Sequence, residues 1–180
     1  MTETSRLLKQ SVISSAVNNR DWISCALNEH EPSLIRYAQF FVGDVEVARD
    51  VVQDAFLKLC RQEQPVESAH LKRWLFKVCR NGAIDHFRKE NRVSHSNIAV
   101  SEIVGREQDP ERSMEQQETH QAVLARIATL PKNQQEVLRL KFQSGFSYRE
   151  IAEVTGLTVS NVGVLLHTAI SKLRIQFAPK

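Results

Sequence analysis

The sequence predicts an all-α protein made of two small helical domains joined by a flexible acidic linker. Val, Leu and Ala recur at spacings of three and four residues along most of the chain, which is typical of amphipathic helices. The 180 residues include only 6 Gly and 5 Pro, too few for the many tight turns of a β protein. Hydrophobic residues make up 42% of the chain and charged residues 25%, so it has enough apolar material to bury a core.

The division into domains rests on residues 93–120, which lack a sustained helical stripe and contain scattered serines and an Asp-Pro pair. We therefore expect four segments: an N-terminal extension (1–21), a first domain (22–92), a linker (93–120) and a second domain (121–180). An extended linker covers about 3.3 Å per residue, so it would let the two domains bind sites roughly 70 Å apart.

The net charge of +3 is unevenly distributed. Residues 1–92 carry 14 Lys or Arg against 12 Asp or Glu, residues 93–120 carry 2 against 6, and residues 121–180 carry 8 against 3. Residues 70–92 alone hold seven cations against two acids. Two basic segments that flank an acidic one favour a polyanion held at two places, although solvated helix faces would give the same charges.

Several classes of protein are disfavoured by what the sequence lacks. No run approaches 18 apolar residues and the start has no secretory pattern, so we expect a cytoplasmic protein without membrane insertion. Cys25, Cys60 and Cys79 are too widely spaced for a zinc motif and are expected to be small buried hydrophobes. Because phosphate-loop and nucleophile motifs are missing, we expect no catalytic residue, metal or cofactor.

In the first domain, two helices are expected after Pro32. A short helix covers 34–42, and a longer one follows the N-cap Asp44 and runs to about residue 62. Its buried stripe consists of Ala48, Val52, Ala55 and Leu59. Another face carries Asp50, Gln53, Asp54 and Leu57. An apolar Leu57 among polar side chains favours a docking surface for a partner protein.

The next helix, from about Leu71 to Lys89, has an apolar side and a basic side. The apolar side includes Gly82, which indicates close packing against a neighbour. The basic side carries Arg73, Lys77, Asn81 and Arg88. With nearby aromatic rings, this surface suits single-stranded or melted nucleic acid, because cations neutralise phosphates and an amide reads base edges. The alternative is that Trp74 and Phe76 are ordinary core residues, the role we expect for Trp74.

The second domain contains a helix-turn-helix pattern. Ser147 and Glu150 form a capping box at the start of the first helix, and Gly156 lies at the turn. Small or apolar residues occupy the motif's buried positions: Ile151, Ala152, Leu157, Val162 and Leu165. Thr158 caps the second helix, which would enter the major groove of DNA. The candidate DNA contacts are Arg149, Ser160, Asn161, Gly163, Val164 and His167. A helical hairpin that merely resembles the motif is the alternative.

Over roughly residues 22–175, the order of these features resembles bacterial RNA polymerase sigma factors of the extracytoplasmic-function (ECF) class. Residues 34–59, LIRYAQFFVGDVEVARDVVQDAFLKL, look like the helices that dock on the clamp helices of the largest polymerase subunit. Residues 73–89, RWLFKVCRNGAIDHFRK, are similar to the segment that melts and reads the minus-ten promoter element. Residues 130–174 look like the domain that binds the polymerase flap and reads the minus-thirty-five element.

The resemblance implies roles for individual positions. It places Asp50, Gln53 and Asp54 at docking positions and Asn81 at a base-reading position. The loop over about 64–69 corresponds to the family's pocket for a flipped base. The acidic linker corresponds to a segment near the polymerase cleft and the RNA exit path. Four positions where the family often has basic residues differ here: Gly163, Leu165, Thr168 and Ile170.

The resemblance therefore implies a sigma factor that binds core RNA polymerase and promoter DNA, and that directs promoter recognition, DNA melting and transcription initiation. It also implies an anti-sigma factor that masks the protein until a signal arrives, and a monomer when free. A stand-alone helix-turn-helix regulator is the main alternative, but it would usually be a dimer and leaves residues 34–89 unexplained. A nucleic-acid-cleaving enzyme built on Asp44, Asp50 and Asp54 is a second alternative.

Overall fold

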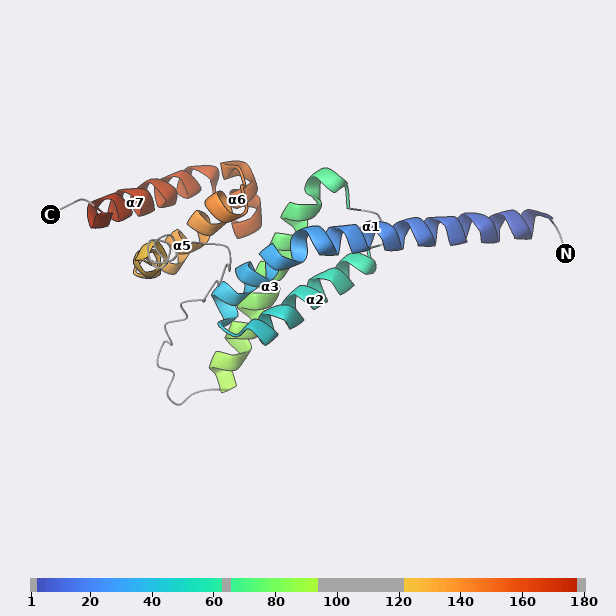
Figure 1. The fold of residues 1–180 in the computed structure, drawn as a ribbon, viewed down its shortest axis with the longest axis horizontal. Helices are drawn as coiled ribbons and strands as arrows, with labels where there is room; N and C mark the ends of the chain where they lie inside the picture. Colours follow the sequence, from blue (N-terminus) through green and yellow to red (C-terminus); the bar gives the residue numbers. More distant parts are fainter. Residues whose placement is uncertain (1–2, 63–65, 94–121, 178–180) are drawn as a thin grey trace, which may run out of the picture.

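The computed structural model describes residues 3–62, 66–93 and 122–177, and within these ranges every regular element is helical (Figure 1). The elements are α1 (Glu3–Val42), α2 (Val45–Cys60), α3 (Ser68–Val93), α5 (Lys132–Leu138), the π-helical η1 (Arg139–Gln143), α6 (Tyr148–Thr155) and α7 (Val159–Phe177). Residues 122–128 are also helical. The all-α prediction is confirmed. The expected linker lies outside the described residues apart from its first position. Residues 64 and 65 of the expected base-binding loop also lie outside them.

Helices α1, α2 and α3 pack against one another as a three-helix bundle (Figure 1). The helix α2 begins where the sequence predicts, because the Asp44 carboxylate accepts hydrogen bonds from the backbone N–H groups of Glu46 and Val47 at 2.7 and 3.1 Å. Its expected stripe is buried together with Val51 and Phe56. A Cβ atom at Gly82 of α3 would lie 3.4 Å from the Val51 side chain, so the two helices meet closely there.

The expected short helix after Pro32 is instead the last part of α1, which continues through the proline. A proline inside a helix removes one backbone hydrogen bond and usually breaks or kinks the helix. Here Pro32 is exposed, and the Ser33 hydroxyl donates to the His30 carbonyl at 2.8 Å. Ala26 and Leu34, on either side of the proline, are both buried in the core. The burial of these side chains therefore offsets the free-energy cost of a proline inside a helix. The helix α1 begins at Glu3, within the expected N-terminal extension.

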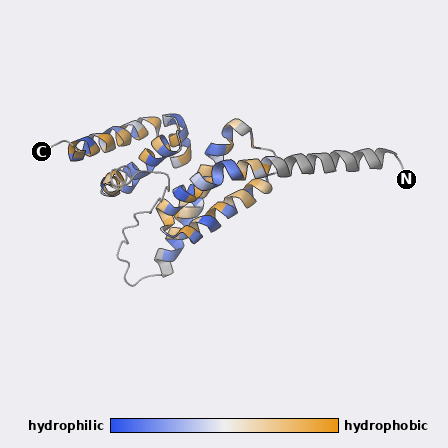
Figure 2. Ribbon diagram, viewed as in Figure 1, coloured by the Kyte–Doolittle hydropathy of each residue, from blue (hydrophilic) through white to orange (hydrophobic). Residues whose placement is uncertain are grey.

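The second bundle contains α5, η1, α6 and α7, and its helix-turn-helix is formed by α6 and α7. Gly156 has φ +75°, the left-handed conformation that ends α6 and turns the chain into α7. The largest fully buried side chains here are Leu140, Ile151, Leu166, Val137, Val154 and Val162. Polar and apolar residues alternate along these helices as expected for amphipathic elements (Figure 2). Among the described helices, none is by itself long and apolar enough to cross a membrane; α6 and α7 pass that test only as a pair, bent by 105°.

The two bundles are packed against each other through α3 and α6. At their contact the Phe76 ring lies edge-on to Phe146, with the ring centroids 5.0 Å apart. The Lys72 ammonium donates to the Ser144 carbonyl at 2.6 Å across the same boundary. The expected picture of two separated modules is therefore incomplete, because each bundle covers part of the other.

Candidate protein and nucleic-acid interfaces

The polar face of α2 presents all four side chains that the sequence singles out as a docking surface. Asp50, Gln53 and Asp54 are exposed, and the Leu57 side chain is 45% exposed. The opposite face of the helix is buried against α1 and α3, so the backbone beneath these side chains is held rigidly. We call these four residues the α2 face. An apolar group surrounded by acids and an amide on a rigid helix suits a protein partner with basic and apolar groups.

On α3 the predicted nucleic-acid surface is only partly open. Lys77, Asn81 and Arg88 are exposed to solvent. Arg73, by contrast, is only 21% exposed, because its Nε lies 2.6 Å from a carboxylate oxygen of Glu153. Glu150 approaches the same guanidinium at 4.0 Å. Arg73 therefore contacts the second bundle, unlike the other three, and its role in binding the minus-ten element stays a prediction.

The aromatic residues near this surface have different environments. Phe76 is fully buried, and its ring contacts Tyr37 as well as the second bundle. Trp74 is partly buried against the core, as expected. Phe87 is 51% exposed next to Arg88, and the sequence reasoning missed it. The sequence could have indicated its exposure, because a helix turns by 100° per residue and this rotation places Phe87 beside the basic stripe of α3 rather than on its apolar side.

A buried carboxylate lies under α3 at the boundary between the bundles. Glu136 of α5 accepts from Arg80 Nε at 2.6 Å and from the Tyr37 hydroxyl at 2.8 Å. Burial raises the pKa of Tyr37 well above its ordinary value, and the charge of Glu136 adds to this effect. Partial burial alone would lower the pKa of Arg80, but the bond to Glu136 and its charge outweigh burial and raise it. The sequence gives no sign of this network, since its members lie up to 99 residues apart.

The helix-turn-helix is locally well determined. The Ser147 N–H donates to Glu150 Oε2 at 2.8 Å, and the Glu150 N–H donates to the Ser147 hydroxyl at 3.3 Å, which confirms the capping box. These bonds to Ser147, more than the nearby cations Arg73 and Lys72, lower the pKa of Glu150. The Thr158 hydroxyl accepts from the N–H of residue 161 at 3.2 Å at the start of α7.

Most candidate DNA contacts of this domain are accessible. The exposed side chains are Arg149, Ser160, Asn161, Val164 and His167. Gly163 is different, because it is partly buried and a Cβ atom there would lie 3.8 Å from the Tyr148 ring. A side chain at this position would therefore make ordinary contact with Tyr148, and the expected DNA contact of Gly163 stays a prediction. Tyr148 and Val159 are exposed apolar residues that the sequence reasoning did not select.

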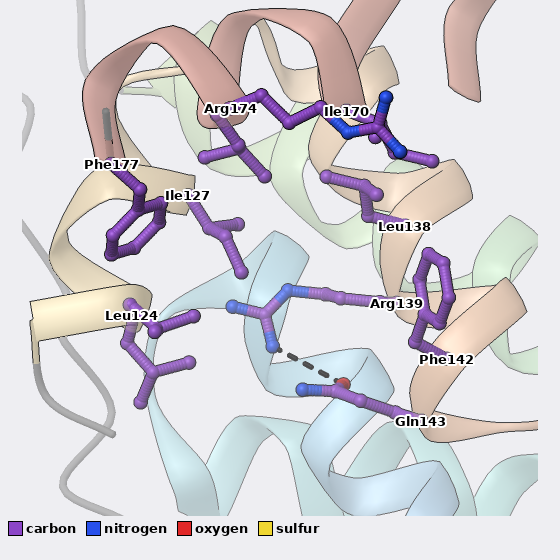
Figure 3. A pocket seen from close by; sticks show the side chains of 11 residues that line it. Leu124, Ile127, Leu138, Arg139, Phe142, Gln143, Ile170, Arg174 and Phe177 are labelled. Carbon is purple, nitrogen blue, oxygen red and sulfur yellow. Dashed lines mark hydrogen bonds between the residues drawn. The ribbon is translucent and has the colours of Figure 1, made fainter. Parts of the chain in front are cut away.

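An apolar groove of about 400 Å³ lies on the second bundle (Figure 3). It is lined by Leu124 and Ile127 from the helix over 122–128, by Leu138 and Phe142, and by Ile170 and Phe177 of α7. Phe142 is 67% exposed. Arg139 and Arg174 also contribute to its lining, and Arg139 donates to Gln143 at 3.5 Å. A groove with apolar walls and cationic groups fits an amphipathic helix.

The cysteines are not all buried, contrary to expectation. Cys79 is fully buried, and burial raises its pKa to about 12. Cys25 and Cys60 are exposed. A cysteine can lie on either side of a helix without disturbing its apolar pattern, so composition alone did not decide their environment.

Comparison with known proteins identifies both bundles. A family model described as Sigma-70 region 2 matches residues 26–93, and one described as Sigma-70, region 4 matches residues 120–173. The chain is 30% identical to the ECF RNA polymerase sigma factor EcfG of Rhodopseudomonas palustris, over 79% of this chain and 77% of that protein. It is 25% identical to the RNA polymerase sigma factor SigV of Bacillus subtilis, over 86% of this chain and 89% of that protein.

Solved structures show the same fold. The chain resembles the sigma factor RpoE, solved in complex with the anti-sigma factor NepR from Bartonella quintana, with a TM-score of 0.70 and 24% identity over 87% of this chain and 98% of that one. It also resembles CnrH, solved with the cytosolic domain of CnrY, with a TM-score of 0.57 and 21% identity over 91% of this chain and 92% of that one.

These matches define the class of protein as one that carries sigma-70 region 2 followed by region 4. Such proteins are non-catalytic transcription initiation factors. The chain belongs to the ECF family of RNA polymerase sigma factors, which direct promoter-specific transcription initiation.

Proposed function

We propose that this sigma factor docks on core RNA polymerase through the α2 face and brings promoter DNA to α3 and to the helix-turn-helix. The observation that carries the proposal is the α2 face itself, with Leu57 exposed among acids and an amide on a rigid helix. The stand-alone regulator has no use for such a surface. The resemblance of 34–59 to the family's docking helices supports the clamp helices of the largest subunit as its partner.

The cations and the amide of α3 support a minus-ten surface. Lys77 and Arg88 would neutralise phosphates of the opened strand, and Asn81 would hydrogen-bond a base edge. Unstacking costs a few kcal/mol per base step, which bases and phosphates held on such a surface would offset. No catalytic residue is needed for this work.

The helix-turn-helix would read the minus-thirty-five element as duplex DNA. Asn161, Ser160 and His167 can hydrogen-bond base edges, and Val164 can contact a thymine methyl group. Arg149, exposed on α6, is placed to bind a phosphate. These contacts are few, so the helix is expected to contribute moderate affinity.

The apolar groove of the second bundle would hold the polymerase flap. The support is its chemistry: apolar walls for the apolar side of a helix, and Arg139 and Arg174 for acidic residues on that helix. We further propose that an anti-sigma factor binds this protein, as NepR binds RpoE and CnrY binds CnrH. The protein would act in the cytoplasm, where polymerase and chromosomal DNA are found.

The test is transcription of fragmented genomic DNA by bacterial core polymerase with and without the purified protein. Discrete start sites that share two upstream elements are the expected result. Binding to DNA without core-dependent initiation would favour a stand-alone regulator instead.

The docking role predicts that Asp50→Ala combined with Gln53→Ala weakens binding to core polymerase by about tenfold, which corresponds to ~1.4 kcal/mol. The affinity for core enzyme, measured by fluorescence anisotropy, checks this. Lys58→Ala, an exposed change on the same helix, is the control and should bind normally. Undiminished binding of the double variant would remove the docking role.

The base-reading role predicts that Asn81→Ala lowers transcription from the cognate promoter without changing polymerase binding. Loss of a good base contact costs about 1–3 kcal/mol, so a decrease of at least fivefold is expected. Core-polymerase affinity is measured on the same sample. Wild-type activity and promoter preference in this variant would contradict the assignment.

A further inference from the structure

The first turns of α7 expose apolar side chains on the side that the helix-turn-helix would turn toward DNA. Val159 and Val164 are 45% and 60% exposed, whereas Val162 between them is fully buried. Side chains four residues apart lie on the same side of a helix. Val159 therefore shares its side of α7 with Gly163, and Val164 shares its side with the exposed Ser160.

An aromatic ring of α6 extends this surface. Tyr148 is 43% exposed, and a Cβ atom at Gly163 would lie 3.8 Å from the Cε2 atom of its ring. The ring therefore lies against α7 next to Val164 in the chain and one turn after Val159. We call Tyr148, Val159 and Val164 the apolar patch. Because exposed apolar groups from both helices of the motif gather here, the patch indicates a binding surface rather than scattered surface residues.

The same part of α7 lacks the side chains that most often read guanine. Arginine and lysine make the commonest specific contacts in the major groove, to the O6 and N7 atoms of guanine. Residues 158–167, TVSNVGVLLH, contain neither. The exposed Asn161 amide instead suits the N6 and N7 atoms of adenine. The thymine paired with that adenine presents a C5-methyl group in the major groove, which an apolar side chain can contact.

We propose that the apolar patch reads the C5-methyl groups of thymines in the minus-thirty-five element, which adds Tyr148 and Val159 to the residues that determine promoter specificity. The inference rests on the proposed role of the helix-turn-helix in binding that element as duplex DNA. The side chains of the patch cover the methyl groups and remove them from water, which favours A·T pairs over G·C pairs at those positions. The element that this protein selects therefore contains thymines opposite the patch.

Apolar reading has a signature that phosphate binding lacks. Contacts to phosphates release counterions, so the affinity that they provide falls as the salt concentration rises. A contact with a methyl group releases no counterion. Discrimination between thymine and a base without the methyl group should therefore stay constant at two salt concentrations, while the total affinity for DNA falls.

The first experiment compares thymine with uracil, which pairs with adenine and keeps the O4 acceptor but has no methyl group. The probe is a duplex selected from a random-sequence library by the full-length protein, with and without core polymerase. Replacing a thymine opposite the patch with uracil should weaken binding about fourfold, the effect of leaving one CH₂-sized group unburied. Fluorescence anisotropy measures the affinity. This comparison leaves the protein unchanged, so it does not depend on the folding of a variant.

Side-chain variants then show which residues contact the methyl groups. Val159→Ala and Val164→Ala should each weaken binding to the thymine duplex and abolish the effect of one uracil substitution. Tyr148→Ala should act in the same way, whereas Tyr148→Phe keeps the ring and should restore the preference for thymine. Ile175→Ala is the matched control, because Ile175 is an exposed apolar residue near the other end of α7, and it should leave the discrimination unchanged.

The outcomes separate this proposal from the proposed function. A selected element without thymine, or equal affinity for the thymine and uracil duplexes at every position, would overturn the reading of methyl groups. Discrimination that survives all three alanine changes would overturn the assignment to the patch. If the free protein discriminates between the duplexes but core polymerase starts no transcription, the base-reading proposal is supported and the sigma function fails. Core-dependent transcription without any effect of uracil means that the base-reading proposal alone fails.

Discussion

Tyr37 shows how one side chain joins the two bundles. It is buried in the first bundle, packs against Phe41 and Phe76, and donates its hydroxyl to Glu136 of the second bundle at 2.8 Å. Burial, followed by the adjacent Glu136 charge, raises its pKa well above the ordinary value of about 10. The folded protein therefore stabilises the neutral, protonated form of the Tyr37 side chain.

This shift predicts a loss of stability at alkaline pH. A raised pKa in the folded state contributes stability that is complete below the unfolded pKa, about 10, and is lost as the pH rises above it. Wild-type stability should fall as the pH rises above about 10. Tyr37→Phe should reduce that fall while costing about 1 kcal/mol at pH 8 from the missing hydrogen bond. Urea denaturation across this range checks both effects.

Tyr148→Phe is the matched control, because Tyr148 is exposed on α6. An identical alkaline loss in wild type and Tyr37→Phe would contradict the coupling of Tyr37 ionisation to folding.

At the scale of the element, the start of α6 is controlled by the capping box. Ser147→Ala removes an acceptor for the Glu150 N–H and a donor to its carboxylate, so it should lower the free energy of unfolding by about 1 kcal/mol at pH 7. The Glu150 pKa is lowered in the folded state, so its contribution is present above the unfolded pKa and is lost as the pH falls through the lower folded value.

The cost of Ser147→Ala should therefore shrink when urea denaturation is repeated near pH 3. Ser160→Ala changes an exposed serine in the first turn of α7 and should alter stability by less than about 0.5 kcal/mol. A cost that is independent of pH would show that the carboxylate takes no part in the cap.

At the scale of the whole molecule, the contact between the bundles predicts a single unfolding transition. The ring pair Phe76–Phe146 and the ion pair Arg80–Glu136 tie the two cores together, so unfolding one bundle exposes part of the other. Calorimetry of the full chain should show one peak, and Glu136→Gln with Glu153→Gln should split or broaden it. Two well-separated peaks in the wild type would mean that the bundles fold independently.

Local chemistry explains why the elements could be predicted. The N-caps Asp44 and Ser147 and the turn at Gly156 act within a few residues, and the apolar stripe of α2 follows from helical periodicity alone. Pro32 is the exception, because the usual rule for a proline is local while the packing of Ala26 and Leu34 that overrides it is not.

The exposed surfaces of the candidate site, like the helices, could be predicted where they depend on local periodicity. The α2 face and three of the four α3 residues are exposed as their periodicity indicates, and their functional roles remain predictions. Phe87 was missed because it lies at the edge of the basic stripe. The apolar groove could not be foreseen, since its walls come from three segments separated by up to about 50 residues.

The sequence by itself determined α2, α3 and the helix-turn-helix, with the caps of α2 and α6 and most of their exposed faces, because these depend on residues within two or three turns of one another. Only the tertiary structure decided that α1 continues through Pro32, that Cys79 alone of the three cysteines is buried, and that Arg73 is bound to Glu153. These outcomes depend on partners distant in the chain, 80 residues away for Arg73, whose approach is set by how the two bundles pack.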